Sequence, residues 1–350
     1  MKTIKDIDVK DKTVLVRVDY NVPLKDGEVV DDLRIRASLP TLQYLLENGA
    51  KRVVLISHLG RPEGKENEEF SLKKVAEVLQ NLLKVDVKFL PLPSSGEKIE
   101  FGDKEKVVLL ENLRFDSGEE ENSREFAENI VKATGADIFV QDGFAVVHRA
   151  HASTSAITEL LPAFAGFLLE KEVNNLSKVL ENPEHPVLLI IGGAKVEDKQ
   201  PLIDKFVNIA DHILVGGKIA ADGYESTNEK IIVAHDFDED GEKQKMDIGP
   251  VSTSEFAKYI EEARTIIWNG CLGKVEDPAF ATASSIVADL IGKNTDATSV
   301  ICGGDTTGFV EGYLKDHPDL KYSLISTGGG AALEFLLGKE LPGITAILAS

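Results

Sequence analysis

Short apolar runs alternate with amphipathic segments along the whole chain, and this alternation constrains the fold most. The runs are continuously apolar, as expected of strands buried on both faces. They occupy residues 14–16, 53–56, 107–110, 138–140, 187–191, 213–215, 231–233, 266–268, 300–301 and 324–325. Between many of them, apolar residues recur at helical spacing, as at Leu72, Val75, Leu79 and Leu82 and at Leu169, Val173, Leu176 and Leu180. Strands that alternate with helices predict an α/β fold built on doubly wound parallel sheets.

The length of 350 residues suits two such domains. A break near residues 160–163 leads us to expect one domain over residues 1–160 and another over 161–337. A helix over 169–180 would join them and end in the proline-containing stretch 182–186. The expected architecture is therefore two doubly wound parallel-sheet domains joined by a helix, with a cleft between them.

The charge of the chain is strongly acidic. Against 39 Lys and Arg residues stand 59 Asp and Glu residues, for a net charge of -20. Nucleic acids and anionic membranes reward a basic surface, so neither is expected as a partner. No apolar signal core or membrane-spanning run is visible, and the two cysteines, Cys271 and Cys302, lack metal-ligand spacing. We therefore expect a cytoplasmic, soluble monomer without a structural metal.

Basic side chains follow the apolar runs of the first half of the chain. The strand tips carry Arg17, Arg61, Arg114 and Arg149, with Arg34 added, and three histidines, His58, His148 and His151. Ligands bind at the carboxyl ends of strands in parallel sheets, and arginine forks suit phosphate and carboxylate groups. The pattern predicts a site for a small substrate that carries both groups; the alternative is scattered surface arginines in salt bridges. The acidic runs 63–69 and 119–121 are expected to be solvated loops.

The stretch 187–207 combines a strand, a glycine pair, two lysines and a helix. Lys195 and Lys199 follow Gly192-Gly193, and Pro201 is expected in the first turn of the helix. A strand, a glycine turn and a helix start with added ammonium groups predict an anion cradle, most naturally for phosphate. The alternative is a tight β–α connection with two solvated lysines.

Glycine-rich turns follow the other strands of the second half. They lie at residues 216–217, 269–270, 303–306 and 327–330. Such turns bring backbone amides to an anion, and several together suit a polyphosphate. Asp305 stands at a strand end among glycines and is a candidate ligand for Mg²⁺ carried by a nucleotide. Because neither G-x-x-x-x-G-K-[ST] nor G-x-G-x-x-G occurs, the two commonest nucleotide folds are not supported, and the two halves suggest a kinase that closes over its substrates.

These motifs, taken together, resemble those of the phosphoglycerate kinase family over nearly the whole chain. The N-terminal signature is similar at residues 17–23, with Tyr20 for the usual Phe. The substrate loops are similar at 57–62, 111–115 and 148–153, and the nucleotide-side motifs at 192–196 and 326–331. The ending at 338–343 is similar as well.

The resemblance implies a role for individual residues. The residues that would bind 3-phosphoglycerate or its acyl phosphate are Asp19, Asn21, Arg34, His58, Arg61, Arg114 and Arg149. Those that would bind the nucleotide are Lys195, Lys199, Gly217, Glu276 (at the ribose), Gly303, Gly304, Asp305, Thr306, Gly328 and Gly329. Catalytic roles are implied for Arg34, Lys195, Gly304 and Gly328, and the metal ligand would be Asp305, holding Mg²⁺ with ATP or ADP. The segment 338–350 would pack back on the first domain.

Departures from the family pattern gather on the nucleotide side. Cys271 stands where proline is usual, Cys302 where a glycine is, and Ala332 where a serine is. Val275 replaces a phenylalanine, Lys218-Ile219 replaces Gly-Met, and the stretch 222–246 is shorter than typical. The resemblance implies phosphoglycerate kinase activity. A catalytically weak homologue that binds phosphorylated metabolites, or a kinase for another carboxylate, remains an alternative.

Overall fold

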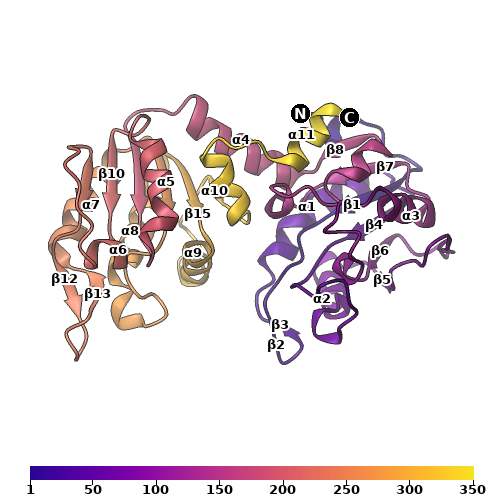
Figure 1. Ribbon diagram of the computed structural model, residues 1–350, viewed down its shortest axis with the longest axis horizontal. Helices are drawn as coiled ribbons and strands as arrows, with labels where there is room; N and C mark the ends of the chain where they lie inside the picture. Colours follow the sequence, from indigo (N-terminus) through magenta and orange to yellow (C-terminus); the bar gives the residue numbers. More distant parts are fainter. The chain divides into compact units, whose positions relative to one another are not determined.

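The computed structural model describes residues 1–350, which divide into two compact units. Unit 1 comprises Met1–Lys171 and Glu340–Ser350, and unit 2 comprises Glu172–Lys339 (Figure 1). Each unit contains its own six-stranded sheet. The predicted α/β class with two parallel sheets is confirmed.

The sheet of unit 1 has the strand order β5-β6-β4-β1-β7-β8, with every neighbouring pair parallel. Its strands are β1 (Thr13–Arg17), β4 (Arg52–Ile56), β5 (Val87–Leu90), β6 (Val107–Leu110), β7 (Ile138–Gln141) and β8 (Ala163–Ala165). The central strands β1, β4, β6 and β7 are buried along their whole length, as their continuous apolar runs predict. The edge strands β5 and β8 were not predicted.

Helices α1, α2 and α3 belong to unit 1. They span Leu33–Glu47, Lys73–Leu83 and Arg124–Thr134. The bounds of α3 follow from its caps, because the Ser123 side chain accepts from the Phe126 amide and Gly135 ends the helix in a left-handed conformation. A small hairpin, β2 (Leu24–Lys25) and β3 (Glu28–Val29), follows β1. Short 3-10 helices lie at η1 (Ile4–Asp6), η2 (Glu68–Phe70), η3 (Leu113–Phe115), η4 (Phe144–Val146) and η5 (Ala156–Glu159).

The sheet of unit 2 has the order β11-β10-β9-β14-β15-β16 and is also parallel throughout. Its strands are β9 (Val187–Ile191), β10 (His212–Val215), β11 (Ile231–Val233), β14 (Thr265–Asn269), β15 (Thr298–Cys302) and β16 (Leu324–Ile325). A separate antiparallel hairpin is formed by β12 (Phe237–Glu239) and β13 (Lys245–Ile248). Most of this hairpin lies in the stretch 222–246, which the resemblance implies is shorter than usual.

The helices of unit 2 follow the strands in turn. They are α5 (Val196–Phe206), α6 (Gly217–Ala221), α7 (Pro250–Glu262), α8 (Thr282–Lys293), α9 (Gly304–Asp316) and α10 (Gly330–Leu336), with a 3-10 turn η6 (Pro278–Phe280). The prediction that Pro201 lies in the first turn of α5 is wrong, because the helix begins at Val196. Pro201 has no backbone N–H, so the helix loses one hydrogen bond there. Burial of Leu202, Ile203 and Phe206 compensates for this loss.

The two units divide inside α4 (Phe167–Glu181), between Lys171 and Glu172, rather than at the expected 160/161 position. The reason is β8, which directly follows Pro162 and pairs with β7, so that the chain up to the first turn of α4 still packs in unit 1. The chain returns to unit 1 at Glu340, close to the expected start at 338. There α11 (Pro342–Ala349) packs against β8, and the Gly343 amide donates to the Val147 carbonyl oxygen at 2.9 Å.

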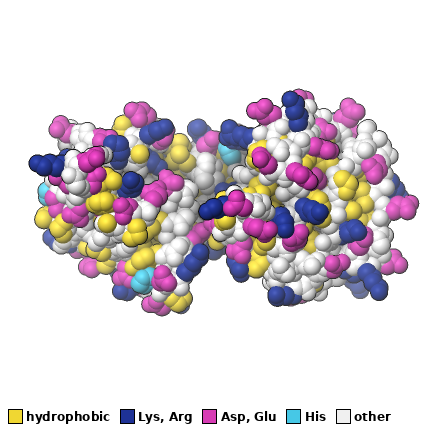
Figure 2. All heavy atoms as spheres, turned by 90° about the horizontal axis from the view of Figure 1, so that it is seen from below, with side chains coloured by type: hydrophobic (Ala, Val, Ile, Leu, Met, Phe, Trp, Pro, Cys, Tyr) yellow, Lys and Arg dark blue, Asp and Glu magenta, His cyan; other side chains and the backbone are white.

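Acidic side chains are spread over the surface in view in Figure 2 and are interspersed with lysines and arginines. None of the helices is both long and apolar enough to cross a bilayer.

Candidate active site

In unit 1, the carboxyl ends of four adjacent strands carry the basic residues that the sequence singles out. Strands β6, β4, β1 and β7 are neighbours in the sheet, so the segments that follow them meet at one edge. Arg17 ends β1, His58 follows β4, Arg114 follows β6, and Arg149 follows β7. The parallel topology therefore collects cations that are far apart in sequence.

Arg17 lies buried at the centre of this group. Its Nε donates to the Ser153 hydroxyl at 2.7 Å, and its Nη2 lies 3.2 Å from Nδ1 of His58. A guanidinium can only donate, so Nδ1 of His58 accepts and the ring hydrogen lies on Nε2. Arg17 thereby fixes His58 as a hydrogen-bond donor through Nε2. Arg17 was predicted to lie at a strand tip, but it was not assigned a substrate-binding role.

Glu119 supplies the charge that balances Arg17. Its Oε1 lies 3.8 Å from Arg17 Nη2, and its carboxylate accepts from the Ser153 hydroxyl at 2.6 Å and from the Ser153 amide at 3.0 Å. The expectation that 119–121 is a solvated loop is wrong for Glu119, which is fully buried. A buried cation requires a partner, and Glu119 provides it.

Two histidines of this group are held in the neutral form. Burial lowers the pKa of His58 well below its ordinary value, and Arg17, Arg114 and Arg34 lower it further. Burial also lowers the pKa of His151 to about 4, again with Arg114 and Arg17 contributing. At neutral pH both rings are uncharged hydrogen-bonding groups among cations.

The loop after β4 is held by predicted site residues. The Asn21 side-chain oxygen accepts from the Gly60 amide at 2.9 Å, and Arg114 Nη1 donates to the Gly60 carbonyl oxygen at 2.7 Å. Asp19 forms an ion pair with Arg34 from the first turn of α1. The loop that carries His58 is therefore tied to the segments that follow β1 and β6.

The last two predicted arginines, Arg149 and Arg61, lie in different surroundings. Arg149 donates from Nε to Nε2 of His148 at 3.2 Å and lies close enough to Arg114 to lower the pKa of Arg114, after the larger effect of burial. Arg61 is exposed in the loop, and no contact joins it to the group. The structure thus brings together six predicted residues, Asp19, Asn21, Arg34, His58, Arg114 and Arg149, and leaves Arg61 at the surface.

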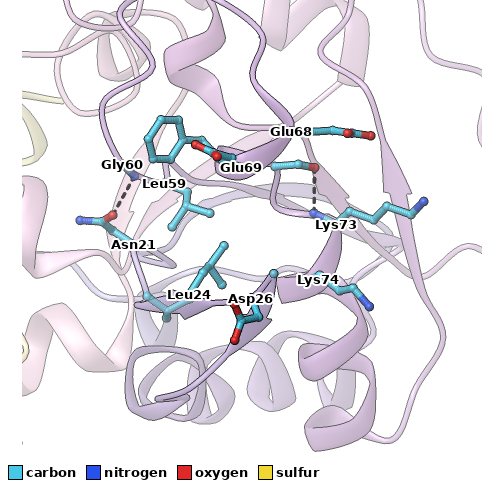
Figure 3. Close-up of a pocket in the computed structure, with 13 residues that line it drawn as sticks. Asn21, Leu24, Asp26, Leu59, Gly60, Glu68, Glu69, Lys73 and Lys74 are labelled. Atoms are coloured by element: carbon cyan, nitrogen blue, oxygen red, sulfur yellow. Dashed lines mark hydrogen bonds between the residues drawn. The ribbon is translucent and has the colours of Figure 1, made fainter.

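A pocket of about 760 Å³ lies beside this group, on the side of Asn21 and Gly60 (Figure 3). Leu24 and Leu59 face each other across it, and Asp26, Glu68, Glu69, Lys73 and Lys74 surround it. None of the predicted arginines lines it. Its lining combines carboxylates and lysines, which does not favour an anionic ligand.

In unit 2, glycines allow the turns after β9, β10 and β14 to pack backbone against backbone. Gly270 has a φ of 104°, and a Cβ there would lie 2.2 Å from the Gly192 carbonyl oxygen. Gly217 has a φ of 62°, and a Cβ there would lie 2.8 Å from the Cys271 carbonyl oxygen. Any larger residue would push these turns apart.

The two predicted lysines occupy different positions. Lys195 is the N-cap residue of α5, and its side chain is exposed. The Lys199 ammonium group donates to the side-chain oxygen of Asn269 at the end of β14. Burial lowers the pKa of Lys199, and the carboxylates of Asp198 and Asp305 oppose this shift. Asn269 belongs to the predicted turn at 269–270, but its side chain was not assigned a role of its own.

The remaining predicted glycines lie where α9 and α10 begin. Gly303 is the N-cap of α9 with a φ of 94°, and Gly329 is the N-cap of α10 with a φ of 50°. A Cβ on Gly304 or Gly329 would meet nothing within 4 Å, so the space over these turns is open. Gly328 donates to the Ser326 hydroxyl at 3.1 Å. Thr306 is buried and its hydroxyl accepts from the Gly270 amide at 2.7 Å, which joins α9 to the turn after β14.

A second pocket, of about 600 Å³, lies entirely in unit 2. Three predicted nucleotide residues, Gly217, Glu276 and Asp305, line it. Residues 243–246 and Phe237, from the β12–β13 hairpin, form another part of its wall and were not predicted. Lys195, Gly304, Gly328 and Gly329 lie outside the lining.

The residues beside the second pocket suit a metal ion that binds together with a phosphate-containing ligand. They do not suit a metal ion that the protein alone holds permanently. No group of three or more His, Cys, Asp or Glu side chains is placed to hold a metal. Asp305 is exposed in the first turn of α9, beside the second pocket. One carboxylate with open space beside it matches Mg²⁺, which keeps several waters and shares phosphate oxygens.

The fold and these two groups define a class: an α/β protein of two parallel-sheet units, each with a group suited to anions at the carboxyl ends of its strands.

Comparison with known proteins gives the family to which the chain is similar. The family described as phosphoglycerate kinase matches residues 4–231 and 221–339. The phosphoglycerate kinase of Coprothermobacter proteolyticus is 42% identical over 400 residues, covering 99% of both chains. That of Fervidobacterium nodosum is 41% identical, over 99% of this chain and 98% of the other.

Solved structures of phosphoglycerate kinases are similar to this chain over nearly its whole length. The phosphoglycerate kinase of Coxiella burnetii superposes with a TM-score of 0.83 at 34% identity, covering 99% of this chain and 98% of that one. The enzyme of Pyrococcus horikoshii superposes with a TM-score of 0.84 at 29% identity and the same coverage. The chain belongs to the phosphoglycerate kinase family, whose members are phosphotransferases with a carboxyl group as acceptor.

Proposed function

We propose that this protein is a phosphoglycerate kinase that transfers a phosphoryl group reversibly from 1,3-bisphosphoglycerate to ADP, giving 3-phosphoglycerate and ATP in glycolysis and gluconeogenesis. The observation that carries the proposal is the group of cations at the carboxyl ends of β1, β4, β6 and β7, in a chain with a net charge of -20. Arginines that gather at strand ends in an otherwise acidic protein are suited to binding an anion there.

Unit 1 would bind the three-carbon substrate. Its phosphate and carboxylate groups would be held by Arg34, Arg61, Arg114 and Arg149, with His58 donating through Nε2. Asp19 and Asn21 would accept from its hydroxyl group or orient the basic residues, as they now orient Arg34 and the loop at Gly60.

Unit 2 would bind the nucleotide, with the base and ribose in the pocket that Gly217 and Glu276 line. Lys195, Lys199 and the amides at residues 303–306 and 328–329 would hold the phosphates. Asp305 would hold the Mg²⁺ that accompanies the nucleotide, and this ion would neutralise charge on the phosphate oxygens.

The transfer would be in line and would need no general base. The attacking carboxylate or phosphate oxygen is already ionised at pH 7, so the protein need only position the reactants and stabilise charge. Arg34 and Lys195 would neutralise the oxygens of the phosphoryl group in flight, with backbone amides at Gly304 and Gly328. Because each substrate is assigned to a different unit, transfer would follow domain closure.

Small molecules would be the only partners, with no nucleic acid or membrane. We propose a monomer in the cytoplasm, because the chain is acidic and has only two cysteines, both buried and free.

The test is a coupled assay of the purified chain with 3-phosphoglycerate and either ATP or GTP, with Mg²⁺ or with EDTA. We expect turnover that requires 3-phosphoglycerate and Mg²⁺ together. Tight binding of 3-phosphoglycerate without turnover would select the catalytically weak homologue. Turnover only with another carboxylate acceptor would assign a different kinase activity.

A further inference from the structure

Asn269 and Cys302 form a buried pair at the carboxyl edge of the unit 2 sheet. They are the last residues of the adjacent strands β14 and β15 and lie opposite each other in the parallel register. Asn269 is 2% exposed and Cys302 is fully buried. The pair therefore lies directly beneath the turns assigned to nucleotide phosphates.

The orientation of the Asn269 carboxamide follows from its two neighbours. The Lys199 ammonium group can only donate, so the carboxamide oxygen must face it. The NH2 end then faces β15, where its nitrogen lies 3.2 Å from the Cys302 sulfur. Sulfur is a weak acceptor, and it satisfies a donor that water cannot reach.

Lys199 is confined by this arrangement. Its side chain runs over the Gly193 turn, where a Cβ on Gly193 would lie 3.6 Å from the Lys199 Cε. Its ammonium group ends at Asn269, between the turns that follow β9 and β14. The long, flexible side chain of lysine otherwise loses much rotamer freedom on binding an anion.

We propose that Cys302 is a positioning residue for nucleotide binding, whose sulfur holds the Asn269 carboxamide so that its oxygen anchors the Lys199 ammonium group among the phosphate-binding turns. This inference rests on the proposed function, because it assigns the nucleotide phosphates to unit 2. Burial raises the pKa of Cys302 to about 11, so its thiol stays protonated at neutral pH.

The first experiment compares Cys302→Ala, Cys302→Ser and Val300→Ala in the full chain. Val300 is a fully buried residue of the same strand and takes no part in the site, so its variant reports lost packing alone. We expect Cys302→Ala to weaken MgADP binding about fivefold to tenfold, because the Lys199 side chain is then no longer held in place before the anion binds and must be ordered on binding, with 3-phosphoglycerate binding unchanged. Cys302→Ser keeps an acceptor and should stay within about twofold of the native chain. Val300→Ala should lower the melting temperature and leave both affinities unchanged.

A double-mutant cycle tests whether Cys302 acts through Asn269. In an Asn269→Ala background, replacing Cys302 by Ala should cause no further loss of MgADP affinity. Additive losses would overturn the route through Asn269.

Three further results would each overturn the inference. MgADP affinity could be unchanged in Cys302→Ala, the serine could fail to rescue it, or Val300→Ala could weaken MgADP binding equally. If the native chain binds no MgADP, the proposed function fails with the inference. If it binds MgADP and Cys302→Ala binds it equally well, only the inference fails.

Discussion

The individual side chains of unit 1 show how an acidic protein keeps a cationic site. His58 and His151 stay uncharged because burial and the surrounding arginines oppose a further proton. They add hydrogen-bonding capacity without adding positive charge, and Arg17 sets the tautomer of His58. At this scale the group is a set of fixed hydrogen-bonding side chains, and the transfer we propose requires none of them to take up a proton.

The neutral histidines lead to a prediction on pH. The ring proton signals of His58 and His151 should show no titration near pH 6.5, where an ordinary histidine titrates. His151 should instead titrate near pH 4 in the native protein, as followed by its ring proton signals in NMR. Since the unfolded chain takes up this proton at higher pH, the contribution of His151 to stability should fall as the pH drops from about 6.5 to about 4. A native titration near 6.5 would contradict the assignment.

Lys195 is predicted to act mainly in the transition state. Lys195→Ala should lower kcat about 10²- to 10³-fold, by analogy with the removal of one oxyanion-hole donor. Its stability should be near normal because the side chain is exposed. Lys258→Ala, on the exposed face of α7, serves as the matched control and should leave kcat unchanged. A decrease of less than about fivefold would remove Lys195 from the mechanism.

Elements owe their positions to polar contacts that join segments distant in sequence. The 116–123 loop is held to the segment after β7 because Glu119 accepts from Ser153. The start of α4 is held to β7 and α1 because Asp142 accepts from the Leu168 amide and the Thr41 hydroxyl, each at 2.9 Å. Both carboxylates are fully buried.

Removing the charge of Glu119 should destabilise unit 1. Glu119→Gln leaves Arg17 buried without its counter-charge, a change that costs about 3–5 kcal/mol in comparable buried pairs. Glu120→Gln is the control: Glu120 is exposed beside Arg114, and its loss should cost less than about 1 kcal/mol. Urea unfolding of the three proteins measures the difference. Equal stabilities of the two variants would show that the pair is not a structural anchor.

Asp142 should make stability depend on pH in the opposite direction to His151. Burial raises its pKa to about 7, so the native state keeps a proton that the unfolded chain releases. Its contribution to stability should therefore fall as the pH rises from about 4 to about 7, by at most about 1.4 kcal/mol per pH unit. Asp142→Asn, which keeps the oxygen that accepts from Thr41 and Leu168, should flatten this part of the curve. An unchanged slope in chemical denaturation would refute the assignment.

The sequence predicts elements whose signal is local and misses those that depend on distant partners. Strands such as β9 are continuous apolar runs, and their burial could be predicted directly. The edge strand β8, Ala-Phe-Ala after a proline, has no such signal. Glu119 stands in an acidic run, and only the fold brings Ser153 to it. The link between Lys199 and Asn269 is likewise hidden, since 70 positions separate the two residues.

At the scale of the whole molecule, we propose that each unit binds one of the two substrates. The chain enters unit 2 through α4 and returns at Glu340, so unit 1 contains both termini. The amide of Gly343 in α11 donates to the Val147 carbonyl oxygen, just before His148 and Arg149, and so α11 is tied to the loop that we propose binds the substrate.

The most direct test is equilibrium binding of 3-phosphoglycerate and MgADP to the native chain, Arg114→Ala and Lys199→Ala. We predict that each variant loses affinity for one ligand only, and that the two variants lose different ligands. Arg114→Ala should weaken 3-phosphoglycerate binding about tenfold or more and leave MgADP within about twofold, and Lys199→Ala should do the reverse. If either variant weakened the other ligand instead, or if the native chain bound neither ligand, the assignment of one substrate to each unit would be contradicted.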